Sequence, residues 1–232
     1  MQIIDAQKVD MSKFGVNTSC GVYLIHLKVL DINSRAKEII NMLTDKSWIH
    51  KLGVVDRKSY EARAEQTIKK IVGDILTKVD SKVTEDFGEY LVSDSAGNAL
   101  RDTHKHVKVV LAELWKEQKT GNPGFDFHTE GPNEMILFGE AKFKTSGSPY
   151  TIALEQIVDF VQFKKDEMEL ADLQRLVSPN AISNAVANIK GYIAAFSLNA
   201  INHVSIFEKA LKSDAAQKLL CHKELYLIGV EI

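Results

Sequence analysis

The sequence predicts an α/β protein, because apolar runs of strand length are separated along the chain by segments with the periodicity of amphipathic helices. Runs of strand length occupy Gly21–Leu30, Met135–Phe138 and Leu225–Ile232. Between the first two of these runs, apolar residues of Ser59–Val79 recur every three to four positions, which favours one long helix. With 232 residues the chain can form one packed domain, or a core with an N-terminal appendage.

The first part of the chain predicts two strands and a helix. A short strand is expected at Gln2–Asp5, ahead of the stronger one that begins at Gly21. A helix fits Ser34–Leu43, with the side chain of its first residue as the N-cap. We therefore expect residues 1–55 to form an extension that packs on a core domain of residues 56–232.

The middle of the chain predicts a helix, an ambiguous segment and a turn. Thr84–Val92 is expected to be helical, because Phe87 and Leu91 fall on one face. In Val107–Lys116 some apolar residues alternate as in a strand while others follow a helical stripe, so periodicity alone leaves both open. Gln118 to Gly124 contains glycine, asparagine and proline in succession and predicts a turn.

The last third of the chain predicts helices followed by a strand. Tyr150–Leu176 fits a helix, and Ser178-Pro179 is a strong helix start, with the serine as N-cap and the proline at the first helical position. From Ile182 to Leu211 an apolar stripe at three-to-four spacing predicts further helix, with Gly191 as a candidate interruption. This stripe is expected in the core or in a subunit interface, and the final strand is expected to close an edge of the sheet.

The composition excludes several classes of protein. No apolar run approaches the ~20 residues that a membrane span needs, so no membrane association is expected. The segment after Met1 lacks the basic and apolar regions of a secretory signal. Cys20 and Cys221 are far apart and without metal-ligand spacing, which fits reduced thiols in a cytoplasmic protein. No glycine-rich phosphate-binding loop is present, so an ATPase is not expected.

The charge of the chain gives only local support for nucleic-acid binding. A net charge of −2 is unusual for a protein that binds nucleic acid on its own. From Lys46 to Lys82, nine lysines and arginines stand against five acidic residues. This segment could present a stripe that faces phosphates, or it could be an ordinary solvated helix face, and the sequence leaves both open.

Two short apolar segments carry the most informative charged residues. They read Gly124-Phe125-Asp126-Phe127 and Gly139-Glu140-Ala141-Lys142-Phe143. If both are strands of a hairpin, the two-residue alternation places Glu140 and Lys142 on one face, where Asp126 can lie opposite them. His128, two residues beyond Asp126, would share that face. Two converging carboxylates suit a hard divalent cation such as Mg²⁺, and a neighbouring lysine can orient or deprotonate water, or neutralise a phosphate.

The surroundings of this pair favour a functional site over a structural ion pair. Most Glu-x-Lys triplets lie on solvated helix faces, where ion pairs contribute little. Here the pair lies between Phe138 and Phe143, and charges buried among apolar side chains need partners or a metal.

The pattern resembles the PD-(D/E)xK nuclease superfamily. Asp126 matches the Asp of its motif, Glu140 the Glu and Lys142 the Lys, whereas the proline of the motif is absent. Gln156-Ile157-Val158-Asp159-Phe160 is similar to the Gln-x-x-x-Tyr signature of the RecB-like branch, with phenylalanine in place of tyrosine. The wider run from Glu89 to Phe143 is also similar to the nuclease subunit of the Hachiman anti-phage system.

The resemblance implies a restriction-endonuclease-like core, in which a central mixed sheet with an antiparallel meander is flanked by helices. It requires a strand shortly before Asp126, which favours strand for the second half of Val107–Lys116. It implies a Mg²⁺ or Mn²⁺ ion held by Asp126, Glu140 and the carbonyl of Ala141. The remaining implied roles are a further metal ligand, Glu89, from the preceding helix, and a contact to a metal-bound water or a phosphate from Gln156.

The expected function is that of a Mg²⁺- or Mn²⁺-dependent endodeoxyribonuclease with little sequence preference, in which Lys142 activates water. As a Hachiman-like nuclease it would be the effector of an anti-phage defence system and would work with a superfamily 2 helicase subunit. The alternative is a catalytically silent nuclease-fold module that binds a partner protein or nucleic acid, or an unrelated α/β protein in which the triplet is a coincidence. The choice between DNA and RNA, the number of metal ions and the oligomeric state stay open.

Overall fold

In the computed structural model, which describes residues 1–75, 83–116 and 124–232, seven strands of the described chain form one mixed sheet. The strands are β1 (Gln2–Val9), β2 (Gly21–Lys28), β3 (Val107–Lys108), β4 (Phe127–Glu130), β5 (Ile136–Lys142), β6 (Gly191–Ser197) and β7 (Glu224–Glu231). Their order across the sheet is β1-β2-β7-β6-β5-β4-β3. The four central strands from β2 to β5 are parallel, and the strands at both ends join antiparallel.

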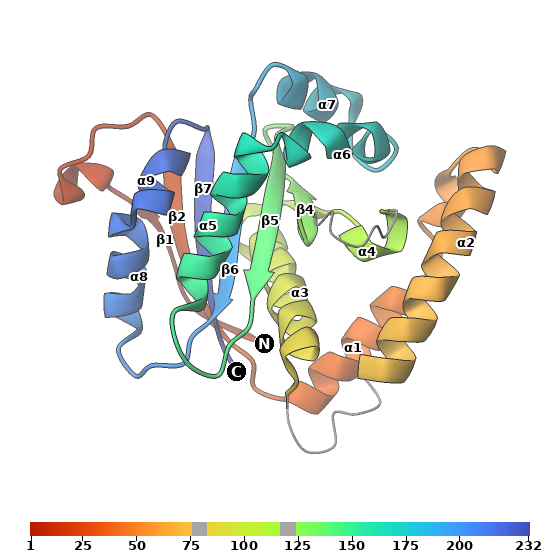
Figure 1. The fold of residues 1–232 in the computed structure, drawn as a ribbon, viewed down its shortest axis with the longest axis horizontal. Coiled ribbons are helices and arrows are strands. Elements are labelled where there is room, and N and C mark those ends of the chain that lie inside the picture. Colours follow the sequence, from red (N-terminus) through yellow and green to blue (C-terminus); the bar gives the residue numbers. More distant parts are fainter. Residues whose placement is uncertain (76–82, 117–123) are drawn as a thin grey trace.

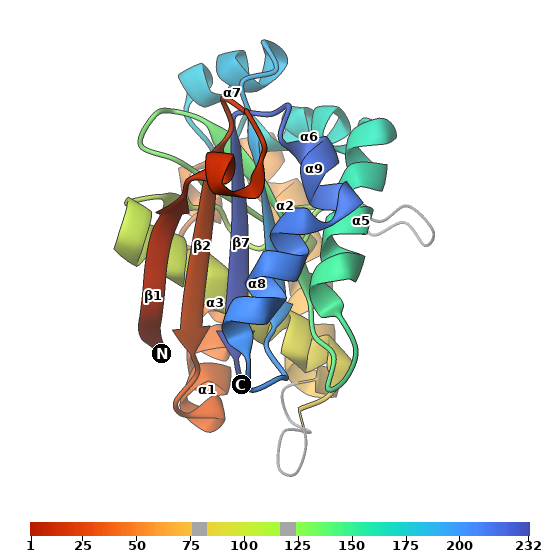
Figure 2. The ribbon, with the colours of Figure 1, turned by 90° about the vertical axis from the view of Figure 1, so that its left-hand side faces the viewer.

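Helices cover both faces of the sheet. They are α1 (Ile32–Thr44), α2 (Val54–Lys70), α3 (Glu85–His104), α4 (Ala112–Trp115), α5 (Pro149–Gln162), α6 (Lys165–Leu173), α7 (Pro179–Val186), α8 (His203–Lys212) and α9 (Asp214–Leu219). Figures 1 and 2 show α5, α8 and α9 on one face and α3 on the other. The predicted α/β class is thereby confirmed.

The N-terminal strands belong to the same sheet as the rest of the chain. Every residue of β2 pairs with a residue of β7, from Gly21 opposite Glu224 to Lys28 opposite Glu231. β1 is longer than predicted, because it pairs with β2 along its whole length. α1 begins earlier than predicted, because the side chain of Asp31, rather than that of Ser34, accepts the capping hydrogen bond.

The secondary structure of Val107–Lys116 differs from the predicted one. The first two residues form β3, but the second half, expected to be a strand, forms the short helix α4. The helical conformation is favoured over a strand because it buries Leu114 and Trp115 and lets the indole of Trp115 donate to the carbonyl of Val110. The end of the long predicted helix, residues 76–79, and most of the predicted turn before Gly124 lie outside the described residues.

The predicted continuous helix from Ile182 to Leu211 is wrong, because α7, β6 and α8 replace it. Every residue of β6 is buried, so both faces of this strand are apolar and it lacks the alternation that identifies a half-exposed strand. Ile193 and Phe196 therefore continued a helical spacing by chance. β6 begins at Gly191, where a Cβ would lie 2.8 Å from the carbonyl oxygen of Glu224.

Two further expectations for the last third are corrected. The final strand exists as β7, but it lies between β2 and β6 instead of at an edge, which explains its nearly continuous burial. The long helix after Tyr150 is divided into α5 and α6 at Lys164, which adopts a left-handed backbone conformation with φ 56°. No helix in the described ranges is both long and apolar enough to cross a bilayer.

Candidate functional site

The residues of the predicted site meet at the carboxyl end of β5. Beyond Gly139, β5 continues to pair with β6 but no longer with β4. The chain just before β4 turns toward this free side of β5. There the backbone N–H of Asp126 donates to the carbonyl of Gly139 over 2.9 Å, and Asp126 Oδ2 accepts from the N–H of Ala141 over 2.8 Å.

Alternation along β5 places Glu140 and Lys142 on the same face. The Glu140 side chain is completely buried, and its Oε1 accepts a hydrogen bond of 2.7 Å from Lys142 Nζ. Its second oxygen, Oε2, is equally buried and has no hydrogen-bond partner among the described residues. A buried polar atom without a partner costs free energy, which marks this position as unusual.

A glycine on α3 brings a third carboxylate to the same place. A Cβ on Gly88 would lie 2.1 Å from the ring of Phe143, so only glycine allows α3 to approach the end of β5 this closely. The next residue, Glu89, lies with its Oε1 3.5 Å from Lys142 Nζ. We call Glu89, Asp126, Glu140 and Lys142 the carboxylate–lysine cluster.

Negative charge exceeds positive charge in this cluster. Burial, reinforced by the charge of Asp126, raises the pKa of Glu140 well above its usual range. Burial also raises the pKa of Asp126, against the opposing effect of Lys142, and raises that of Glu89. Burial alone would lower the pKa of Lys142, but the surrounding carboxylates outweigh it and raise that pKa. One ammonium group therefore does not compensate three carboxylates, and the cluster would gain from an additional cation.

The donor atoms of the cluster fit a hard cation. The unpartnered Glu140 Oε2 is a carboxylate oxygen, and Oδ2 is the only oxygen of Asp126 engaged with Ala141. Because the N–H and C=O of one strand residue point to the same side, the carbonyl of Ala141 faces Asp126 as well. Mg²⁺ commonly binds one or two carboxylates and keeps several waters. Within the described chain, however, Glu89, Asp126 and Glu140 do not form a group of three ligand atoms all within 4.8 Å of one another.

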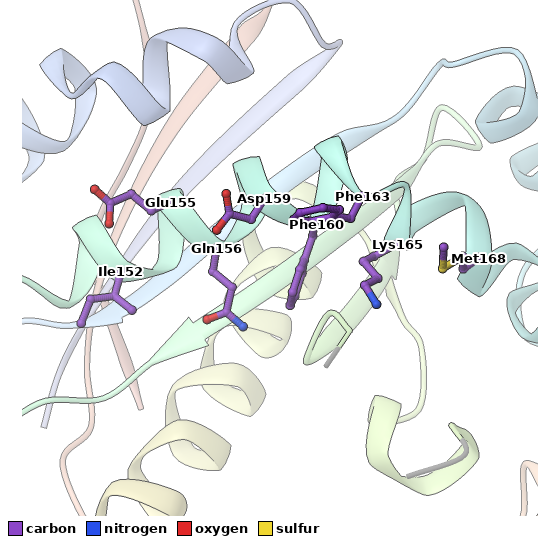
Figure 3. Close-up of a pocket in the computed structure, with 8 residues that line it drawn as sticks. All are labelled: Ile152, Glu155, Gln156, Asp159, Phe160, Phe163, Lys165 and Met168. Atoms are coloured by element: carbon purple, nitrogen blue, oxygen red, sulfur yellow. The ribbon is translucent and has the colours of Figure 1, made fainter. Parts of the chain in front are cut away.

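Gln156 lies on α5, which packs against β5 and β6. Figure 3 shows Gln156 and Phe160 pointing to one side of α5, whereas Glu155 and Asp159 point away. Gln156 lines an open cavity of about 770 Å³ together with Ile152, Glu155, Asp159, Phe160, Phe163, Lys165 and Met168. In the described chain no hydrogen bond joins Gln156 to the carboxylate–lysine cluster, so its implied contact to a metal-bound water or phosphate stays a prediction.

A second buried carboxylate, Glu169 on α6, lies beside the cluster and was not predicted. Its Oε2 is hydrogen-bonded to Nε2 of His128 over 2.6 Å, and its Oε1 accepts from Lys116 Nζ over 2.5 Å and from the N–H of Phe125 over 3.0 Å. His128 shares the face of Asp126 as expected, but it is buried and bound to this glutamate. No local sequence pattern predicts the role of Glu169, because its side-chain partners are 41 to 53 residues away in the sequence.

Three of the six cations of the basic segment whose side chains the structure describes make contacts within the protein. Arg57 donates to the carbonyl of His50, Arg63 to that of Trp115, and Lys69 pairs with Glu65. Lys58 is exposed. These contacts favour a solvated helix face over a dedicated stripe for phosphates.

Comparison with known proteins identifies no relative: no protein-family model matches the chain, and no curated protein or solved structure is significantly similar to it.

Proposed function

We propose that this protein is a divalent-metal-dependent nuclease that hydrolyses phosphodiester bonds of DNA with little sequence preference. The observation that carries the proposal is Glu140, a completely buried carboxylate with one unpartnered oxygen, next to a lysine and two further carboxylates. A strongly perturbed carboxyl group that lacks compensating charge is typical of functional sites.

The order of elements around the cluster supports the proposal. α3 is followed by β3, the short helix α4, β4 and β5, with the three strands paired antiparallel, then by α5, α6 and α7 and by β6 parallel to β5. Apart from α4, α6 and α7, this order agrees with the helix, antiparallel meander, helix and strand that the resemblance to the PD-(D/E)xK superfamily implies. The cluster lies where that resemblance places the catalytic residues, at the end of β5.

In this mechanism Asp126, Glu140 and the carbonyl of Ala141 would hold Mg²⁺ or Mn²⁺, with Glu89 as a further ligand. The ion supplies positive charge that polarises the scissile phosphate and the attacking water. The N–H of Ala141 fixes the Asp126 carboxylate. Lys142, partly accessible and bonded to Glu140, is placed to orient water or to donate to a phosphate oxygen. Gln156 on α5 is proposed to contact a metal-bound water or the phosphate.

A partner that delivers the DNA is part of the proposal. A net charge of −2 gives little long-range attraction to a polyanion, and Arg57, Arg63 and Lys69 of the basic segment already contact other groups of the protein. By the Hachiman resemblance, we propose a helicase-type partner and a role in defence against phage. The Ile182–Leu211 segment does not offer a continuous docking surface for it, because β6 in its middle is buried and separates the exposed Val186 from the exposed Val204.

A second candidate is a nuclease-fold module that binds a partner or nucleic acid without cutting. One observation favours it: Lys142 already pairs with Glu140 and Glu89, so the described cluster is partly compensated without a metal. This candidate predicts binding of Mg²⁺ or of nucleic acid without cleavage.

Conversion of supercoiled plasmid by the purified chain in Mg²⁺ or Mn²⁺ tests the proposal, with single-stranded DNA and RNA as parallel substrates. Lys144→Ala is the matched control for Lys142→Ala, because Lys144 lies just beyond β5 and pairs with Glu85 instead of the cluster. We expect metal-dependent DNA cleavage that Lys142→Ala abolishes and Lys144→Ala retains. Unchanged cleavage by Lys142→Ala would contradict the proposed site, and metal binding without cleavage of any substrate would establish the second candidate.

A further inference from the structure

Two histidines and a glutamate from three separate elements meet on the α8 face of the sheet, away from the carboxylate–lysine cluster. His26 lies on β2, opposite Gly229 of β7, and Glu231 lies two residues beyond Gly229. Because alternate residues of a strand share a face, Glu231 points to the same side as His26. His203 is the first residue of α8, which packs on this face. Figure 2 shows the start of α8 beside the C-terminal end of the chain.

The three side chains converge closely. One ligand atom from each of His26, His203 and Glu231 lies within 4.8 Å of the other two. The imidazole rings of the two histidines are 4.6 Å apart between centroids and nearly perpendicular. His26 Nε2 lies 3.5 Å from Glu231 Oε2, and this buried nitrogen has no hydrogen-bond partner in the described structure. The potential metal-ligand atoms of the three side chains thus lie close together, and His26 Nε2 remains without a hydrogen bond.

One oxygen of Glu231 is left for a further partner. Lys28 bonds to Oε1 of Glu231, and Oε2 is the oxygen that faces His26.

We propose that His26, His203 and Glu231 form a binding site for a divalent transition metal, with Zn²⁺ as its principal ligand. Imidazole nitrogen suits Zn²⁺, Cu²⁺ and Ni²⁺, whereas Mg²⁺ prefers oxygen alone. Two histidines and one glutamate leave a fourth position of tetrahedral Zn²⁺ open, as in catalytic rather than structural zinc sites. Both histidines line a cavity of about 370 Å³.

This site is independent of the proposed nuclease centre. In the order β2-β7-β6-β5, the strand of His26 is three strand spacings from β5 and that of Glu231 is two, so the strands that carry the two sites are about 10 to 14 Å apart. Their ligand chemistry also differs, since one offers oxygen atoms only and the other two nitrogens and one oxygen. Zinc binding can therefore be measured on the full chain without any assay of cleavage.

Calorimetric titration of the chelator-treated full chain with ZnCl₂ tests the proposal. We expect one Zn²⁺ per chain, with an affinity at least tenfold lower in His203→Ala and in Glu231→Gln. His50→Ala is the matched control, because His50 is exposed and distant in sequence from the three ligands. Zn²⁺ should also raise the melting temperature of the unmodified chain, since it binds the folded form. Co²⁺ in its place should give visible absorption that His203→Ala removes.

The outcomes that would overturn the proposal are equally defined. Absence of saturable Zn²⁺ binding to the folded chain would remove the site. Binding that survives His203→Ala and Glu231→Gln but disappears in Cys221→Ser would assign the metal to the exposed thiol of Cys221 instead. Equal loss in His50→Ala would show surface chelation and would equally contradict the assigned ligands.

Discussion

Two buried glutamates, Glu140 on β5 and Glu169 on α6, differ in how far hydrogen bonds and charges compensate the burial of their carboxylates. Both oxygens of Glu169 have partners, from His128, Lys116 and the N–H of Phe125. Burial would raise the pKa of Glu169, but His128 and Lys116 outweigh it and hold that pKa below its usual value. Glu140 has one partnered oxygen and two nearby carboxylates, and its pKa is raised.

The difference separates a carboxylate that stabilises the fold, Glu169, from one that destabilises it, Glu140. Glu169 ties α6 to the segment around β4, and its ionised form is stabilised by the contacts that the fold supplies. Ionised Glu140 is destabilised by its surroundings, and nothing in the packing of β5 requires an acid there. Positions that break local consistency in this way are expected to be functional, and the two glutamates can be compared by equivalent substitutions.

The largest expected difference is in cleavage. Glu140→Gln should reduce metal-dependent plasmid cleavage roughly a thousandfold, because loss of a metal ligand removes several kcal/mol of transition-state stabilisation. The amide keeps the size of the side chain and an acceptor for Lys142, so the fold should be preserved. The measurement is the initial rate of nicking at saturating Mg²⁺, with Mg²⁺ affinity determined in parallel.

Glu169→Gln is the companion to that measurement. Because Glu169 does not belong to the carboxylate–lysine cluster, we expect cleavage within about tenfold of the unmodified protein. A loss as large as that of Glu140→Gln would mean that the two glutamates form one functional unit, and the proposed distinction between them would not hold.

The next largest effect is on stability, where substitution of Glu169 is expected to matter more than substitution of Glu140. Glu169→Ala should lower the free energy of unfolding by about 3 kcal/mol, because it leaves Lys116 and His128 without their buried partner. Glu140→Gln should leave the stability of the metal-free chain unchanged or increase it. Urea unfolding in the presence of a chelator measures both, and a larger loss for Glu140→Gln would refute the contrast.

Parts of the fold and of the candidate site could be predicted because their signals are local. The Glu-x-Lys triplet at the end of an apolar run indicated β5, and a short connection placed Asp126 beside it. The structure brings Asp126, Glu140 and Lys142 together, while their chemical role stays a prediction. Glu89 could be placed only through the resemblance, and the structure brings it to 3.5 Å from Lys142 because Gly88 permits close packing.

The remaining features depend on contacts between distant segments, which periodicity does not encode. β6 was missed because a strand buried on both faces has no alternation, and α4 depends on how Trp115 packs. The proposed zinc ligands His26 and Glu231 lie on strands far apart in the sequence, and the parallel pairing of β2 with β7 makes them neighbours. The buried position of Glu169 likewise depends on its hydrogen bond with His128, which is 41 residues away in the sequence.

A smaller effect is expected in the dependence of stability on pH, with opposite signs for the two glutamates. The pKa of Glu140 is raised on folding, so its contribution is present below the unfolded pKa and is lost as pH rises through the folded value. The pKa of Glu169 is lowered, so its contribution is present above the unfolded pKa and is lost as pH falls. Each unit of pKa shift corresponds to about 1.4 kcal/mol.

Metal-free unfolding between pH 4 and pH 8 tests these signs. The stability of Glu140→Gln relative to the unmodified chain should increase with rising pH, since the variant no longer carries an ionisable group in this place. The deficit of Glu169→Gln should instead shrink as the pH is lowered. Parallel curves for the two variants would show that their environments are not electrostatically distinct.

The smallest expected effect concerns Gln156, which lines a cavity along α5 and has no hydrogen bond to the carboxylate–lysine cluster in the described chain. Gln156→Ala should lower cleavage by about three- to tenfold, because a neutral amide that orients a water or a phosphate contributes roughly one hydrogen bond, about 1 kcal/mol. Stability should not change, since no hydrogen bond that the structure describes is lost. Gln162→Ala, at the exposed end of the same helix, is the matched control and should cleave normally. Equal rates for both variants would remove Gln156 from the site and leave the carboxylate–lysine cluster to act without it.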